Sequence, residues 1–252
     1  MSMKNSHLSL LDLLPYPLNP PTGPGEPQLM GQTSVSPPAT VRKRATIVEQ
    51  IEQEHRAARL YGEQLINLRP LNLTPTETQA IVADHRLQHV CLEQYVMPQV
   101  TVTPMLRAVA LSRHVRAQYR RRGRISRHSA AWIWGYASEL TLPIHLDFDR
   151  QLRLNMSRAR FEDIQVHQVR TIPYDSLPLA ELNITTPSRT ALDLLLFEPS
   201  SDELLSAIIS DPASDCTLRS LRRALDNTKY VKHRDAIEER LFGLAARPKN
   251  KS

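Results

Sequence analysis

The chain is poor in the residues on which several classes of protein depend. Its seven glycines among 252 residues are scattered, which excludes a glycine-rich phosphate loop. Its two cysteines, Cys91 and Cys216, are too few for a disulfide framework or a four-cysteine zinc site. No stretch approaches the roughly 18 apolar residues of a membrane span. Asp12 and Pro15 interrupt the leucine-rich start before it resembles a signal peptide. We therefore expect a cytoplasmic protein with no membrane partner.

No familiar catalytic motif is present either. Ser129 lies in Arg-His-Ser-Ala-Ala and not in a nucleophile elbow. His85 and His89 are four residues apart but lack the glutamate of a zinc-peptidase motif. We expect no enzymatic activity, no metal, no cofactor and no small-molecule substrate. The alternative is a degenerate nuclease or nucleotidyltransferase accessory, which would need a cluster of carboxylates that the sequence does not reveal.

Proline is abundant in one place only. Residues 15–40 hold eight of the 19 prolines and no apolar periodicity. Such a segment cannot bury enough apolar surface to offset its ordering entropy. We expect residues 1–45 to be disordered, and residues 1–40 to be dispensable for folding. The alternatives are a ligand for a proline-binding groove, or a true start at Met30.

The next part, 46–103, is predicted to be a small helical module. Apolar residues at helical spacing over 47–65 predict an amphipathic helix. Thr74 and Glu77, with Pro75 between them, form a capping box that begins a second helix, and short strands are expected over 90–96. This order is similar to a winged helix-turn-helix. Because 62–73 lacks the usual tight turn, we interpret the module as degenerate; the alternative is a helix and hairpin with a structural role only.

The remaining part, 104–252, is predicted to be an α+β domain in which a small mixed sheet packs with helices. One helix is expected from Pro104 to about Gly123, and a short one over 129–134 ends at Gly135. Residues 144–148 alternate between apolar and polar, the period of a half-buried strand, and 164–166 begin another. Further helices are expected from Pro187, and over 200–209, 217–225 and 236–244.

Three side chains of this domain have specific expectations. Trp132 should pack in the core. Arg189 and Asp193, four residues apart, should form a local ion pair on the helix that follows Pro187. A binding role for Arg189 is the alternative.

Positive charge is concentrated in one segment. No acidic residue occurs from Gln94 to Ser138, although eight arginines do, so the rest of the chain has a net charge of −2 within a total of +6. Arginine suits phosphate oxygens by charge and by forked hydrogen bonds. The candidate DNA-binding residues in this segment are Arg113, Arg116, Arg120, Arg121, Arg122, Arg124 and Arg127. On a single helix the first three would share one face. The alternative is that these arginines pair with acids of the protein such as Glu139, Asp147 or Asp149.

The capped helix supplies a second set of candidates. Thr76, Gln79 and Arg86 are residue types that contact phosphates or base edges. We expect them to contact DNA if this helix enters a groove.

Two stretches resemble those of a known family. Ser129-Ala-Ala-Trp-Ile-Trp-Gly135 and Thr185-Thr-Pro-Ser-Arg-Thr-Ala-Leu-Asp193 are similar to the signature stretches of the AbiEi-type antitoxins, with His167 in a strand between them. Leu73-Thr-Pro-Thr-Glu77, and Thr103-Pro-Met-Leu-Arg-Ala108 further on, resemble members with a shortened winged helix. The resemblance covers about 63–246.

The resemblance implies an antitoxin of a type IV toxin–antitoxin system. In that family the winged helix binds the operator of its own operon, and the C-terminal domain counters a nucleotidyltransferase-like toxin without a stable complex. Some relatives carry a C-terminal nuclease domain. We expect that domain to be absent, because no strand follows the last expected helix before Ser252. The proline-rich start and the degenerate helix-turn-helix depart from the family pattern.

Overall fold

The computed structural model describes Arg56 and residues 59–120, 122–152, 163–170, 173–228 and 231–246. The chain divides into two units, Met1–Gln53 and Glu54–Ser252, and every described residue belongs to the second. The disordered segment predicted over 1–45, most of the first predicted helix and Arg121 therefore lie outside the described residues. Within those ranges, no helix combines the length and the apolar character that crossing a membrane requires.

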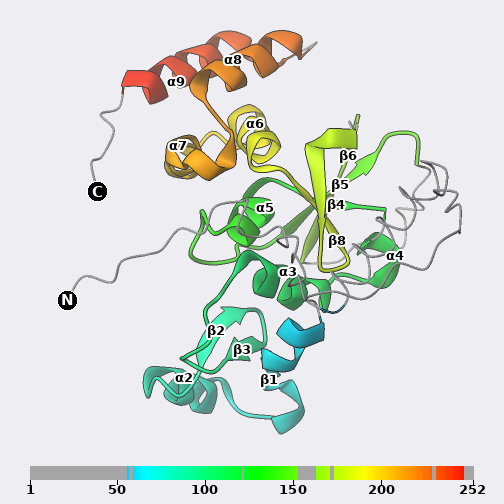
Figure 1. Ribbon diagram of the computed structural model, residues 1–252, viewed down its shortest axis with the longest axis vertical. Helices are drawn as coiled ribbons and strands as arrows, with labels where there is room; N and C mark the ends of the chain where they lie inside the picture. Colours follow the sequence, from blue (N-terminus) through cyan, green and yellow to red (C-terminus); the bar gives the residue numbers. More distant parts are fainter. Residues whose placement is uncertain are drawn as a thin grey trace, which may run out of the picture. The chain divides into compact units, whose positions relative to one another are not determined.

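The described chain begins with a small three-stranded sheet flanked by helices (Figure 1). A helix over 59–64 is followed by β1 (Ile66–Asn67), the 3-10 helix η2 (Arg69–Leu71), α2 (Pro75–Ala83), β2 (Gln88–Cys91) and β3 (Gln94–Val96). The strands are antiparallel in the order β1-β3-β2. The predicted capping box is confirmed: Thr74 N donates to Glu77 Oε2 at 2.8 Å, and Glu77 N donates to Thr74 Oγ1 at 3.2 Å.

The helix predicted from Pro104 to Gly123 is wrong in its length. Two helices occupy this segment, α3 (Pro104–Ser112) and α4 (Ala117–Arg120). The chain turns after Ser112, whose Oγ donates to Val109 O at 2.8 Å. Beyond the turn, Val115 is buried and Tyr119 meets Phe148 edge-on, with ring centroids 5.8 Å apart. Helical spacing of the apolar residues continues across the turn, so periodicity could not reveal it.

A five-stranded mixed sheet forms the centre of the rest, which confirms the predicted α+β class with a mixed sheet. In spatial order its strands are β6 (Ile164–Val169), β5 (Ile144–Asp149), β4 (Arg124–Ile125), β8 (Leu182–Thr185) and β7 (Ser176–Leu179). The pairs β5–β6 and β4–β8 are parallel, whereas β4–β5 and β7–β8 are antiparallel. The 3-10 helix η4 (Pro173–Asp175) leads into β7.

Strand β5 is buried on both faces, so its interpretation as half-buried is wrong. Ile144, Leu146 and Phe148 join the first hydrophobic core, together with side chains of α3. The alternate residues His145 and Asp147 are also buried, at 9% and 3% exposure. Strand β5 therefore has one apolar face and one face on which His145 and Asp147 are shielded from water.

The remaining predicted helices are present. They are α5 (Arg127–Trp134), α6 (Pro187–Phe197), α7 (Asp202–Ser210), α8 (Leu218–Asn227) and α9 (Arg234–Ala246), with the 3-10 helix η5 (Pro212–Ser214) after α7. Gly135 ends α5 at φ +93°, a left-handed conformation that glycine adopts without strain. Trp132 is 1% exposed, as expected. Side chains of α6, α7, α8 and α9 form a second hydrophobic core.

Two glycines provide a test of the packing on the apolar face. A Cβ at Gly123 would lie 2.9 Å from both Phe148 Cζ and Tyr119 O, whereas one at Gly243 in α9 would meet nothing within 4 Å. We expect Gly123→Ala to lower the free energy of unfolding by about 1–3 kcal/mol, because overpacking forces neighbours apart. Gly243→Ala should raise it by about 0.5–1 kcal/mol, through helix propensity alone. Urea denaturation measures both, and equal effects at the two positions would contradict this description of the core.

Candidate functional site

A row of polar residues crosses the polar face of the five-stranded sheet. Asp147 of β5 is in register with His167 of β6 on one side and with Arg124 of β4 on the other. Arg124 is in turn in register with Asn183 of β8. Because directly opposed residues point to the same face of a sheet, these four side chains form one row. The sequence could not show the row, since its members come from four separate strands.

Asp147 is the most buried member of this row. Ser126 Oγ donates to its Oδ1 at 2.8 Å. Burial raises the pKa of Asp147, while the Ser126 hydrogen bond and nearby Arg127, Arg189 and Arg124 act to lower it. Desolvation of the carboxylate is the stronger of these effects, although three guanidinium groups lie within electrostatic reach.

Two histidines lie beside Asp147 on the same face. His145 Nδ1 and His167 Nε2 are 3.0 Å apart, and the two rings are nearly parallel at 7°. Ser129 Oγ accepts a hydrogen bond from His145 N at 3.0 Å. Burial lowers the pKa of both histidines, that of His167 to about 4, and the charge of Arg127 lowers both further. Both rings are therefore neutral at pH 7, so they add no positive charge to this face.

Arg189 connects two further aspartates to this region. Its Nε donates to Asp193 Oδ1 at 2.9 Å, and its Nη1 donates to Asp175 Oδ2 at 2.7 Å. The predicted Arg189–Asp193 ion pair is thus present, but it is buried and extends to η4. Burial raises the pKa of Asp193 to about 7 despite Arg189, and Asp147 raises it as well. Asp193 Oδ2 is buried without a hydrogen-bond partner among the described residues.

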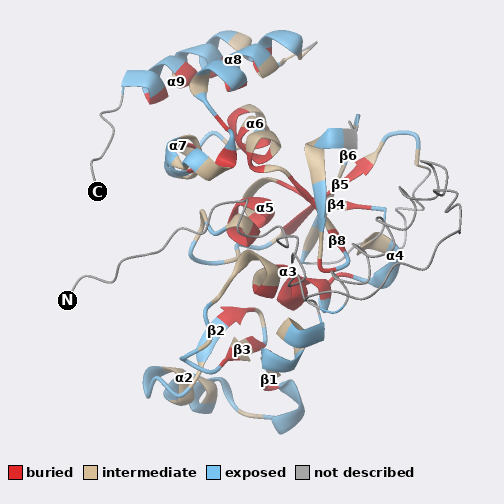
Figure 2. Cartoon of the chain, viewed as in Figure 1, coloured by how far each residue is buried: buried red, intermediate tan, exposed pale blue. Residues whose placement is uncertain are grey.

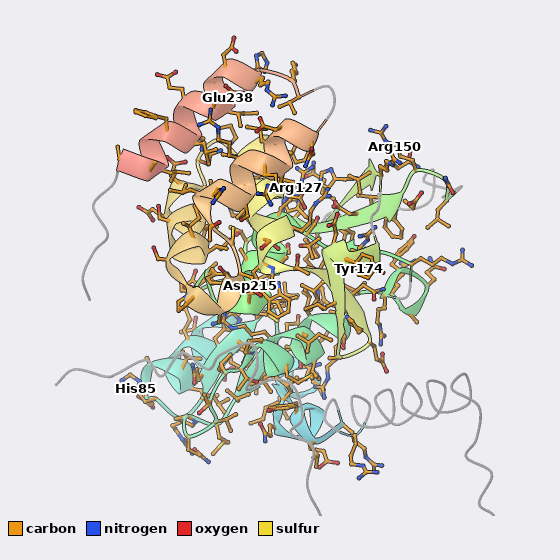
Figure 3. All side chains as sticks on the ribbon, turned by 45° about the horizontal axis from the view of Figure 1, so that its top comes forward. His85, Arg127, Arg150, Tyr174, Asp215 and Glu238 are labelled. Carbon is orange, nitrogen blue, oxygen red and sulfur yellow. The ribbon has the colours of Figure 1, made fainter. Side chains whose placement is uncertain are left out.

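Helices α5 and α6 meet beside this cluster. Arg127 (labelled in Figure 3) donates to Glu198 Oε1 at 3.3 Å, and its guanidinium lies 4.5 Å from the centre of the Phe197 ring. Trp134 Nε1 donates to Thr185 O at 2.7 Å. The stretches 129–135 and 185–193, which are fifty residues apart in sequence, therefore lie against each other in the fold.

Several arginines of the acid-free segment contact the protein itself. Arg113 Nη2 donates to Gly62 O at 2.7 Å and its Nη1 to Gln94 Oε1 at 3.0 Å, which ties α3 to the preceding helix and to β3. Arg120 Nε donates to Val115 O at 2.7 Å, and its Nη1 forms an ion pair with Glu181. Arg107 Nη1 donates to Ala137 O at 3.0 Å.

The other arginines of this segment differ in their surroundings. Arg124 is partly buried, and burial lowers its pKa while Asp175 and Asp147 raise it. Arg116 and Arg122 are exposed. Since α3 ends at Ser112, Arg113, Arg116 and Arg120 do not share one helix, contrary to the expectation. Their role in DNA binding stays a prediction.

The candidates on and after α2 are all at the surface. Thr76, Gln79 and Arg86 are exposed, and α2 has no buried residue. Gln79 also lines an open groove of about 610 Å³, whose walls include Leu68, Leu73 and Tyr95. These three candidates therefore belong to a different element from the arginines and from the polar row.

The chemistry available at the polar row is limited by its partners. Asp147, Asp175 and Asp193 are each hydrogen-bonded to a serine or an arginine. Within the described ranges, no group of three or more histidine, cysteine or acidic side chains is arranged to hold a metal ion. Arg189 is the direct partner of Asp175 and Asp193, and Ser126 is the direct partner of Asp147.

Neither the models of known protein families nor the curated proteins give a match to this sequence.

Asp193 on α6 and His167 in the polar row predict an unusual dependence of stability on pH. The pKa of Asp193 is about 7 in the folded protein against an ordinary 3.8. Between about pH 4 and 7 the folded state therefore binds more protons at Asp193 than the unfolded state does, so the contribution of Asp193 to stability falls as the pH rises. With a pKa of about 4 against 6.5, His167 contributes in the opposite direction over about pH 4 to 6.5. The two contributions therefore oppose each other over about pH 4 to 6.5.

Asp193→Asn should therefore make the free energy of unfolding rise with pH between 4.5 and 6.5, by on the order of 2 kcal/mol relative to the native protein. His167→Gln should make it fall over the same interval. Asp215→Asn is the control, since Asp215 is exposed on η5's C-terminal side. Urea denaturation at both pH values measures the effect. Identical pH dependence in all four proteins would contradict the described burial.

Proposed function

We propose that the protein is a non-enzymatic, cytoplasmic regulator of the antitoxin type, which binds DNA of its own operon and counters a nucleotidyltransferase-like toxin. The observation that carries the DNA-binding part is the arrangement of α2. It is a capped helix with no buried residue, and it lies between a strand and a two-stranded hairpin.

The element order supports a winged helix-turn-helix. A helix, β1, η2, α2 and the hairpin β2–β3 follow one another, and the sheet order is β1-β3-β2. In a winged helix, two helices stand between the first strand and the hairpin, and the second of them enters the major groove. Here η2, a single 3-10 turn, stands where the first of these helices would be. That replacement accounts for the degenerate appearance of 62–73.

The surface chemistry of α2 supports base contact more than backbone contact. Thr76 and Gln79 offer hydroxyl and amide groups, which read base edges. Only three arginines occur over 59–103, against four acidic residues, so this part adds no net positive charge. The exposed Arg86 and Arg122 are the candidates for phosphate contact. Arg113 and Arg120 are assigned mainly to holding the fold together.

The antitoxin part rests on the two stretches that resemble the AbiEi-type family. They form one structural unit, because Trp134 of the first donates to Thr185 of the second and α5 packs on α6. A resemblance carried by residues that contact each other is stronger than one carried by unrelated segments. The proposal expects a nucleotidyltransferase-like toxin in the neighbouring gene.

A second candidate function, a degenerate nuclease, has one observation in its favour. The fold gathers Asp147, Asp175 and Asp193, the kind of carboxylate cluster that an enzyme would need. A regulator remains the better proposal, because arginines face these carboxylates and leave Asp193 largely shielded from water. A scaffold that binds only protein is distinguished by its lack of affinity for the upstream region.

The DNA-binding proposal predicts different effects for different variants. Thr76→Ala and Gln79→Ala should each reduce the preference for the upstream region over a shuffled duplex, by about 1–3 kcal/mol if a base contact is lost. Arg122→Gln should instead weaken binding to both duplexes alike, and flatten the log–log salt dependence by about one unit. Arg120→Gln should mainly lower stability, because it leaves Glu181 unpaired.

Fluorescence anisotropy at several salt concentrations measures both quantities. Gln165→Ala is the matched control, since Gln165 is an exposed glutamine on β6. No preference of the native protein for its upstream region would sink the operator part of the proposal. If Gln165→Ala and Gln79→Ala reduced the preference for the upstream region equally, α2 would no longer be a candidate for the operator contact.

A further inference from the structure

Helix α8 presents three arginines on one exposed face. Arg219, Arg222 and Arg223 are exposed, and their spacing of three and four residues places them on one side of a helix. Leu221 and Leu225 are buried at 2% and 0% exposure, in the second hydrophobic core. Burial of the leucine side fixes the rotation of the helix, so the arginine side faces water (Figure 2).

The positive charge of this face is not neutralised by the protein. Across the part of the chain that the structure describes, no ion pair or hydrogen bond is found for the three guanidinium groups. Asp226, four residues after Arg222, is held by Arg234, with Oδ1 to Nη2 at 3.0 Å. Arg113, Arg120 and Arg127 contrast with this, because each contacts an oxygen of the protein.

We propose that this face of α8, defined by Arg219, Arg222 and Arg223, binds the phosphate backbone of duplex DNA without regard to sequence. Arginine forks match phosphate oxygens by geometry as well as charge. From Arg219 to Arg223 the helix rises about 6 Å. That length corresponds to about two base-pair steps of a duplex, so neighbouring phosphates lie within reach of the three side chains.

The apolar side of α8 argues against the other common polyanion, an anionic lipid surface. A helix that lies in a membrane interface inserts an apolar face among the lipids. In α8 that face packs against α6 and α9 and is occupied within the core. The exposed face offers charge without apolar side chains, which suits a hydrated phosphate backbone.

This inference does not rest on the proposed operator binding. The operator preference is assigned to α2, whereas the face of α8 should act on any sequence. A duplex of random sequence therefore tests binding by the face of α8 separately from the operator preference of α2.

The experiment measures the affinity of the full chain for a short random duplex as a function of salt. Replacing all three residues, Arg219→Gln with Arg222→Gln and Arg223→Gln, should flatten the log–log slope by up to about three units, at about −0.9 per phosphate contact. The corresponding triple change to lysine should keep most of the slope, because the charge remains. A control variant, Arg150→Gln with Arg170→Gln, neutralises two exposed arginines at the ends of β5 and β6 and should leave the slope unchanged.

Several other outcomes overturn the inference. If the triple glutamine variant keeps its melting temperature and its salt slope is unchanged, α8 does not contact the DNA, even if the operator preference persists. If the control variant flattens the slope by the same amount for each charge removed, the effect is one of net charge alone. DNA is excluded as the partner if the native chain does not bind the random duplex. It is also excluded if the chain instead binds phosphatidylserine vesicles through these arginines. Conversely, sequence-independent binding through α8 in a protein without operator preference would support this inference and reject the operator proposal.

Discussion

The shielding of charge on one face of the central sheet is the constraint on which the rest of the structure depends. Asp147 and Asp193 are 3% and 1% exposed, and neither could be buried as a carboxylate without cations nearby. Arg189 supplies the direct contact to Asp193 and extends it to Asp175. Helix α6 is thereby joined to η4. Even so, burial raises the pKa of Asp193 to about 7.

The same constraint explains how the arginines are distributed. Arg113, Arg120 and Arg127 each join elements that are distant in sequence: the helix over 59–64 to α3, α4 to the β7–β8 turn, and α5 to the end of α6. A segment with eight arginines and no acid therefore serves partly as a set of internal connections. Arginines that the fold does not use in this way lie elsewhere as well, on α8 in particular. Local charge in a sequence is thus a poor guide to where the positive surface lies.

The elements that the sequence predicted well have local causes. Thr74, Thr103 and Thr186 each cap a helix whose first residue is proline, and Gly135 ends one in a left-handed conformation. Strands β4, β7 and β8 were missed because they are two or four residues long and owe their order to pairing with distant partners. The turn after Ser112 was missed because the apolar spacing continues across it.

The candidate site was predictable only in fragments. The Arg189–Asp193 pair follows from spacing along one helix, whereas Asp175 joins it from a separate loop. The alternation in β5 correctly separated two faces, but it could not show that the polar face is shielded, because the shielding groups come from α5 and α6. Thr76, Gln79 and Arg86 were found as residue types, and the structure adds that the first two lie on α2, that Arg86 follows it, and that all three are exposed.

The central claim is that the buried aspartates hold arginines in place and carry out no chemistry. The most direct measurement is incubation of the purified protein with supercoiled plasmid and Mg²⁺ or Mn²⁺, alongside the Asp147→Asn and Asp193→Asn variants. The account predicts that the plasmid stays intact with all three proteins, although the native protein retards it in a gel. Metal-dependent cleavage by the native protein that either single substitution abolishes would contradict the claim and make the polar row an active site.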